Sequence, residues 1–348
     1  VEDLDRIKEE QTLKRDLVSN GKKVGITVHK GTCGLASGAG EVWDKLFELL
    51  KAKGESEEAY RIMHTGCVGF CGMEPIISVE FPGEKPVRYR RVDPAKLEQI
   101  LEGHVFGGEV QEKHILNEEE DPFFQGQEFV VLRNRGRMDP ESIDDYIAHG
   151  GYQGLHKALT VMQPADVVEH VLKSGIRGRG GAGFPTGLKW KFAMQAKGDT
   201  KFVLCNADEG DPGAYMDRSV LESDPHSVVE GMAIAARAIG SRQGYIYCRA
   251  EYPIAVTTLQ KAIEAAREYG LLGEDIFGTG FSFNVDMYGG AGAFVCGEET
   301  ALMASVEGKR GNPRPRPPFP ANQGLWNKPT ILNNVETLSN IPNIIREG

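Results

Sequence analysis

The chain has 348 residues, a length typical of two or three domains. Hydrophobic residues make up 40% of it and charged residues 26%, which excludes a mostly disordered protein. The net charge of −10 argues against nucleic-acid binding, which normally needs a basic face. No apolar run reaches the roughly 20 residues that cross a bilayer, and residues 1–14 lack the apolar core of an export signal. We therefore expect a cytoplasmic protein without direct membrane insertion.

The first 105 residues predict a small α/β unit. Residues 4–19 have the spacing of a charged amphipathic helix, and residues 23–29 alternate as a strand. The next expected elements are a helix over 41–53, strands over 60–64, 76–81 and 87–91, and a helix from Asp93 to Gly103.

Residues 106–128, with an acidic run and Pro122, indicate a linker to a larger unit over 129–348. In this unit strands alternate with helices, which is typical of α/β folds with a mainly parallel sheet. Strands are expected over 201–206, 244–249 and 281–288, and helices over 226–239, 254–269 and 298–306. The proline-rich stretch 309–330 is expected to hold no regular element.

Three of the six cysteines lie in glycine-rich loops between predicted elements: Cys33, Cys67 and Cys71. The last two form a C-x3-C pair in the segment TGCVGFCGMEP. Glycines around thiolates let backbone N–H groups turn toward sulfur, as in iron–sulfur sites, whereas zinc more often takes C-x2-C pairs. The pattern favours a metal or cluster over plain core cysteines. The other three cysteines lie singly in apolar segments and are expected in the core.

The segments GTCGLASGAGEVWDKL and GCVGFCGMEP resemble the thioredoxin-like [2Fe–2S] ferredoxins, which include the small subunit of NADH dehydrogenases. That family has four cysteine ligands, the last two spaced as C-x3-C. The resemblance implies that Cys33, Cys67 and Cys71 are ligands and that one cysteine is missing. His29 stands four residues before Cys33, near the missing position, and imidazole replaces thiolate in Rieske centres. The alternatives are that His29 only ends a strand, and that another group is the ligand or the cluster is absent.

The segment GRGGAGFPTGLKW, residues 178–190, has five glycines in its first ten residues. Its match to G-x-G-x-x-G is weak, because the stretch before it is helical and Pro185 interrupts the stretch after it. Bare backbone N–H groups there are suited to a phosphate, with Arg179 and Lys189 supplying positive charge. Phe184 and Phe192 are suited to stack on a ring. We therefore expect an anion and ring cradle, with a flexible surface loop as the alternative.

Two further segments are suited to a ligand. The first, NADEGDPGAYMDR over 206–218, begins where a predicted strand ends, and open α/β sheets bind ligands beyond the carboxyl ends of their strands. Its side chains can accept hydrogen bonds from ribose or ribityl hydroxyls, unless it is an ordinary acidic turn. The second, GAGAFVCGEETALMASVEG over 290–308, has a glycine turn before Glu298 and Glu299, a pair that the helix dipole alone also favours.

These three segments, with RPPFPANQGLWNKPT and ILNNVETLSNIP, resemble in order the flavoprotein subunit of NADH dehydrogenases over about residues 130–345. The resemblance implies that FMN is held by Gly178, Arg179, Gly180, Gly181, Gly183, Lys189, Asn206, Asp208, Glu209, Asn333 and Asn334. It implies that NADH is held by Phe184, Phe192, Asp211, Glu298, Glu299 and Arg316. The family commonly has Glu at position 211, Tyr at 294 and Lys at 316, so the preference between NADH and NADPH stays open.

A ferredoxin joined in front of a flavoprotein resembles the β subunit of cytoplasmic NAD(P)-linked hydrogenases, including the electron-bifurcating [FeFe] type. The resemblance implies hydride exchange between NADH and FMN without a side-chain acid or base, and single electrons leaving through iron–sulfur partner subunits. The alternatives are the same role in an NAD-dependent formate dehydrogenase or a respiratory NADH:quinone oxidoreductase, and a non-catalytic nucleotide-binding assembly module. The family's [4Fe–4S] cysteine motif is not present by Gly348, so that cluster is expected only in a C-terminal part absent from this chain.

Overall fold

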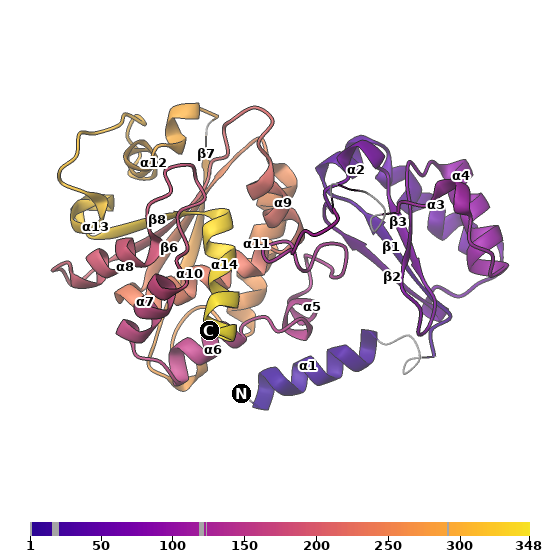
Figure 1. The fold of residues 1–348 in the computed structure, drawn as a ribbon, viewed down its shortest axis with the longest axis horizontal. Coiled ribbons are helices and arrows are strands. Elements are labelled where there is room, and N and C mark those ends of the chain that lie inside the picture. The colour runs from indigo at the N-terminus through magenta and orange to yellow at the C-terminus, as the bar shows by residue number, and fades with distance from the viewer. Residues whose placement is uncertain (1, 16–20, 118–121, 123, 291) are drawn as a thin grey trace. The chain divides into compact units, whose positions relative to one another are not determined.

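The chain divides into two units, an N-terminal unit over Glu2–Ala148 and a C-terminal unit over His149–Gly348 (Figure 1). The computed structural model describes residues 2–15, 21–117, 122, 124–290 and 292–348. The division falls after the predicted linker of 106–128, some of which lies outside the described residues. The division falls later because both the linker and the segment after it form hydrogen bonds with the rest of the N-terminal unit. Leu116 N donates to Arg88 O at 2.7 Å, and Thr65 Oγ1 donates to Met138 O at 2.9 Å.

The N-terminal unit is built on a four-stranded sheet with the order β2-β1-β3-β4. The strands are β1 (Val24–His29), β2 (Tyr60–Thr65), β3 (Ile77–Glu80) and β4 (Val87–Tyr89). β1 pairs parallel with β2 and antiparallel with β3, and β3 pairs antiparallel with β4. A helix connects β1 to β2 and another follows β4, which is the topology of thioredoxin-like domains. The predicted fold of this unit is confirmed.

The helices of the N-terminal unit are α1 (Glu2–Arg15), α2 (Thr32–Ala36), α3 (Ala39–Ala52), α4 (Pro94–Ile100) and α5 (Ile143–Ala148). The end of the predicted helix over 4–19 lies outside the described residues. α2 and α5 were not predicted, because segments of five or six residues show too little periodicity. The apolar face of α3, including Leu46 and Leu50, is fully buried against Ile26 and Val28 of β1.

The C-terminal unit contains a wholly parallel sheet with the order β7-β6-β5-β8. Its strands are β5 (Phe202–Ala207), β6 (Gln243–Arg249), β7 (Asn284–Gly290) and β8 (Thr330–Asn334). Its helices are α6 (Gln153–Thr160), α7 (Pro164–Lys173), α8 (Thr186–Gln195), α9 (Met216–Ser223), α10 (Pro225–Ile239), α11 (Pro253–Glu268), α12 (Glu299–Val306), α13 (Pro320–Gln323) and α14 (Val335–Glu347). Because all four strands run the same way, their carboxyl ends meet at one edge. The predicted α/β class is confirmed.

Two local predictions in the C-terminal unit were wrong. A helix, α8, does follow the glycine loop, because Pro185 stands at the N-cap of that helix, where its missing N–H costs nothing. The proline-rich stretch contains the short α13, which begins at Pro320 for the same reason. Among the described residues, every helix is too short or too polar to span a membrane.

Candidate functional sites

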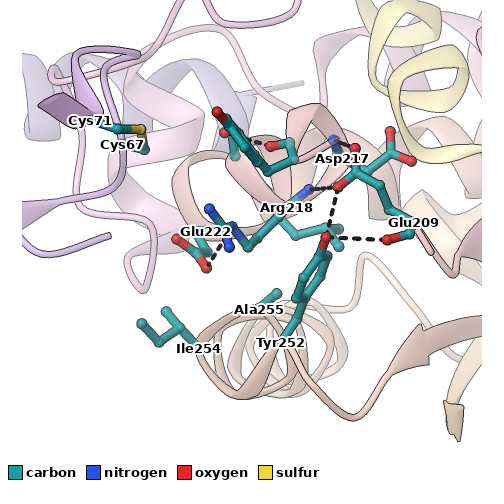
Figure 2. A network of polar contacts seen from close by, with 12 residues as sticks. Cys67, Cys71, Glu209, Asp217, Arg218, Glu222, Tyr252, Ile254 and Ala255 are labelled. Carbon is teal, nitrogen blue, oxygen red and sulfur yellow. Dashed lines mark hydrogen bonds and ion pairs between the residues drawn. The ribbon is translucent and has the colours of Figure 1, made fainter. Parts of the chain in front are cut away.

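The C-x3-C loop holds two sulfur atoms close together. Cys67 Sγ and Cys71 Sγ lie 3.7 Å apart (Figure 2), and Gly69 N–H donates to Cys67 Sγ at 3.3 Å. Two thiolates on one tetrahedral metal, with bonds of about 2.3 Å, lie roughly 3.8 Å apart. The bond from Cys71 and the Gly69 N–H lower the pKa of Cys67, and burial opposes them. The pair therefore fits one metal centre.

Cys33 belongs to the same neighbourhood. A Cβ added to Gly31 would lie 2.9 Å from Cys67 N, so the turn that carries Cys33 packs directly on the C-x3-C loop. Across the described ranges, no three His, Cys, Asp or Glu side chains surround one point as a single ion requires. A two-iron cluster divides its ligands between two ions, and three cysteines on adjoining loops suit that division.

His29 is the last residue of β1 and is fully buried. Its Nε2 lies 3.0 Å from Ser78 Oγ, and its buried Nδ1 has no hydrogen-bond partner among the described residues. Burial, followed by the charge of Arg88, lowers the pKa of His29 to about 3, so the ring is neutral at pH 7. A neutral imidazole is the form that binds metals, and the role of His29 as a ligand stays a prediction.

In the C-terminal unit, the glycine loop of residues 178–190 lies against the end of β8. Asn206 of β5 pairs in register with Asn334 of β8. A Cβ on Gly180 would lie 3.3 Å from Asn334 Cβ, and Arg179 N donates to Thr337 Oγ1 at 2.9 Å. The structure thus brings together predicted flavin residues that are more than 150 positions apart in the chain.

The loop is closed at its base and open at its tip. Gly178 N donates to Phe184 O at 2.9 Å, which closes it. Gly181 and Gly183 have φ values of +98° and +63°, a region that favours glycine. The backbone N–H groups of Gly180 and Gly181 donate to no described residue. They remain available for an anion, as in other phosphate-binding loops.

Asp208, which follows β5, has an unpaired hydrogen-bond acceptor at the carboxyl edge of the same sheet. It is 9% exposed, and its buried Oδ2 has no hydrogen-bond partner among the described residues. Burial raises the pKa of this carboxyl, and Arg249 opposes the shift. Asn206 is already used, since its Nδ2 donates to Gly297 O at 2.9 Å and its Oδ1 accepts from Asp208 N at 3.1 Å. A ligand hydroxyl would satisfy Asp208, which fits the ribityl chain of FMN.

Two side chains of α8 donate hydrogen bonds to residues of β8. Lys189 Nζ donates to Leu332 O at 2.8 Å, and Trp190 Nε1 donates to Asn333 Oδ1 at 2.9 Å. Burial lowers the pKa of Lys189, as does Arg316, whereas Glu299 raises it. Lys189 thus places a half-buried cation where the predicted flavin and nucleotide residues adjoin, while the Asn333 side-chain oxygen is already occupied.

The predicted NADH residues divide into exposed rings and paired charges. Phe184 and Phe192 are 43% and 45% exposed, and Asp211 is also exposed. Glu298 caps α12, accepting from Thr300 N at 2.8 Å and from Ala301 N at 2.9 Å.

Glu299 and Arg316 are joined by an ion pair. Their pairing brings the proline-rich stretch to the start of α12. The ligand roles of both residues stay predictions.

Residues 171–343 match the family described as the Nuo51 FMN-binding domain. That segment belongs to the Nuo51 family. Over 219 residues the chain is 64% identical to the HndC subunit of the NADP-reducing hydrogenase of Solidesulfovibrio fructosivorans. It is 52% identical, also over 219 residues, to a subunit of the NADH-quinone oxidoreductase of Aquifex aeolicus. These matches cover 63% of this chain, but only 44% and 51% of the relatives, so the chain spans about half of their length.

Across the whole chain, the fold is similar to a solved NAD+-reducing [NiFe]-hydrogenase in the H2-reduced state. The TM-score is 0.55 at 27% identity, with 99% of this chain and 58% of that chain covered. This likeness includes both units of the present chain, whereas the Nuo51 match lies in the C-terminal unit.

Within the Nuo51 segment, the carboxylate of Glu209 forms hydrogen bonds within the protein. Its carboxylate accepts from the N–H groups of Asp217 and Arg218, each at 3.1 Å, and from the Tyr252 hydroxyl at 3.2 Å (Figure 2). Glu209 therefore caps the start of α9. Its direct contact with FMN stays a prediction.

Asp217 is the residue of the Nuo51 segment that the sequence reasoning missed. It is buried, its Oδ2 accepts from Asn334 Nδ2 at 2.6 Å, and its Oδ1 lies 3.4 Å from Glu336 N. Its place within the acidic segment of residues 206–218 was a weak signal. Asp217 orients the Asn334 side chain on which the glycine loop packs.

The stability of the protein should depend on Asp217 protonation. Burial, followed by Glu209, raises its pKa to about 7 from an ordinary value of 3.8. Between these values the unfolded chain loses the proton and the folded chain keeps it, so the free energy of unfolding falls as pH rises. A shift of this size corresponds to at most about 4 kcal/mol. Urea unfolding of Asp217→Asn should show a flatter decline than wild type between pH 4 and pH 7, and equal slopes would contradict this assignment.

Proposed function

We propose that the chain is the NADH-binding flavoprotein part of a multisubunit oxidoreductase, which exchanges hydride between NADH and FMN and passes electrons singly to iron–sulfur centres. The observation that carries this proposal is the glycine loop at the carboxyl edge of β5 and β8. There, two unpaired backbone N–H groups, those of Gly180 and Gly181, share the edge with the unpaired carboxylate oxygen of Asp208. Donors for a phosphate and an acceptor for a hydroxyl suit the two ends of one ribityl phosphate.

When bound, FMN supplies the conversion of a two-electron hydride into single electrons. The chain's own residues bind and orient FMN and NADH. Gly180 and Gly181 offer N–H groups to the phosphate, Asp208 accepts from a hydroxyl, and Lys189 adds positive charge in a site of low dielectric constant. Phe184 and Phe192 offer exposed ring faces to the second nucleotide. No side-chain acid or base is required.

The same kind of reasoning supports a [2Fe–2S] cluster on Cys33, Cys67 and Cys71. The thiol spacing and the packing of the two loops support it.

A hydrogenase-type complex is the setting that the comparisons favour. Identity to the hydrogenase subunit HndC is 64%, against 52% for the quinone-linked relative, and the whole-chain likeness is to an NAD+-reducing hydrogenase. We propose iron–sulfur subunits of such a complex as partners, with formate dehydrogenase-type and respiratory complexes as alternatives. The electron-bifurcating activity and the cytoplasmic location stay predictions.

The test is flavin content and anaerobic bleaching of the purified full chain by NADH. We expect an FMN absorbance band that NADH bleaches. A chain that binds no flavin, or one whose flavin NADH leaves unchanged, would instead favour the non-catalytic assembly module.

Replacing Glu299 should weaken NADH binding without affecting FMN binding. Glu299→Ala removes the ion pair between Glu299 and Arg316 and leaves Arg316 only its longer ion pair with Glu298, at 3.7 Å. Glu299 is not among the proposed FMN-binding residues. We expect full flavin content and slower bleaching by NADH, with an apparent Kd for NADH raised about tenfold. Glu268→Ala, on an exposed position of α11, is the matched control. Loss of flavin with normal NADH affinity would show that the two halves of the site are assigned the wrong way round.

A further inference from the structure

Glu74 is a buried carboxylate between the C-x3-C loop and β3. It is 7% exposed, and its Oε2 accepts from Ile76 N at 2.8 Å. Its Oε1 is buried and has no hydrogen-bond partner among the described residues. Leaving a buried polar oxygen unpaired destabilises the fold, so the position calls for a partner that is bound there in the working protein.

Glu74 lies close to the loops that carry the three cysteines. A Cβ on Gly34 would lie 3.3 Å from Glu74 Oε2, so the carboxyl group packs on the turn that carries Cys33. The charge of Glu74 acts on Cys67, and that of Cys71 acts on Glu74. The carboxyl group therefore packs on the turn that carries Cys33 and lies within electrostatic range of Cys67 and Cys71.

His29 has different neighbours. Its ring bonds to Ser78, and the charged group that acts on it is Arg88. Ser78 and Arg88 are register partners across β3 and β4, so the ring lies among side chains of the sheet. The backbone oxygen of His29, rather than its ring, adjoins the cysteine turn, since a Cβ on Gly34 would overlap that oxygen.

We propose that Glu74, through Oε1, is the fourth protein ligand of the [2Fe–2S] cluster held by Cys33, Cys67 and Cys71. This inference rests on the proposed cluster. Three thiolates and one carboxylate carry the same total charge as four thiolates, whereas an imidazole would carry one negative charge less. The cluster potential should thus stay near that of all-cysteine clusters and below the range of Rieske centres.

The experiment compares variants of the full chain after anaerobic reconstitution with iron and sulfide. The readouts are iron and acid-labile sulfide per chain, the electron paramagnetic resonance spectrum of the reduced cluster, and its midpoint potential. We expect about two irons per chain for the wild type. Glu74→Gln should lose most of this iron, since an amide oxygen is a much weaker ligand. Glu74→Cys should keep the iron with shifted g-values, and His29→Ala should match the wild type.

The control is Glu84→Gln, an exposed carboxylate in the same unit. Circular dichroism checks that each variant is folded. If Glu74→Gln is not folded, Glu74→Cys still tests the assignment. A wild-type spectrum and potential in Glu74→Cys would overturn the assignment. So would loss of the cluster in His29→Ala with Glu74→Gln unaffected, which would make His29 the ligand. A wild-type chain without iron would instead overturn the proposed cluster itself.

Discussion

Replacing Lys189 by methionine should weaken FMN binding about tenfold to a hundredfold. Methionine keeps the length and packing of the stem but removes the ammonium, which donates to Leu332 O at 2.8 Å. The lysine is half-buried at the edge of the sheet. A charge-assisted hydrogen bond is worth roughly 1.5–3 kcal/mol, which corresponds to that loss of affinity. The measurement is fluorescence titration of the flavin-free chain with FMN.

The matched control is Lys191→Met, an exposed lysine two positions along the same helix. It should bind FMN as the wild type does. Lys189→Ala should bind no better than Lys189→Met, because it loses the charge and the packing. Full affinity in Lys189→Met would show that Lys189 serves only to join α8 to β8.

Gly231→Ala should destabilise the C-terminal unit by about 3 kcal/mol and weaken FMN binding with it. A Cβ at this position of α10 would overlap Leu338 O and lie 2.9 Å from Leu338 C, which are backbone atoms of α14. A side chain cannot rotate away from a backbone, so the two helices must separate. The first turn of α14 carries Thr337, which binds the glycine loop, so separation also moves the flavin site.

Urea unfolding followed by circular dichroism measures the stability change. Gly289→Ala is the control, because a Cβ there meets no atom within 4 Å and its φ is not positive. It should change the free energy of unfolding by about 1 kcal/mol or less. A Gly231→Ala protein as stable as the wild type would mean that α10 and α14 are not held at this distance.

Local patterns in the sequence were sufficient for the α/β class and for many of its elements, although β8 and α14 were not predicted. Alternating residues predicted β1, and helical spacing predicted α3, because side-chain periodicity depends only on neighbours in the chain. The C-x3-C spacing likewise indicated a metal centre, since two thiolates one turn apart can reach one ion. The short helices α2 and α5 escaped prediction because they offer too few residues to show a period.

The partners of the site residues could not be predicted in this way. Glu209 belongs to an acidic segment that matched a ligand-binding pattern, yet its carboxylate caps α9 and accepts from Tyr252, which is 43 positions away. Asp217 meets Asn334 across 117 positions. Such contacts depend on which strands adjoin in the sheet, and no local spacing encodes the order β7-β6-β5-β8.

The sequence by itself therefore determined the α/β class, because this follows from short-range patterns. It also predicted two kinds of site and the residue types that serve them, from local chemistry and from the family resemblance. Only the tertiary structure decided which polar atoms are used internally and which are left unpaired. His29 and Glu74 are both buried, but the chain packs the Glu74 carboxyl beside the cysteine turn and the His29 ring beside Ser78. That difference arises from the direction of each side chain relative to the sheet, which depends on the packing of the whole unit.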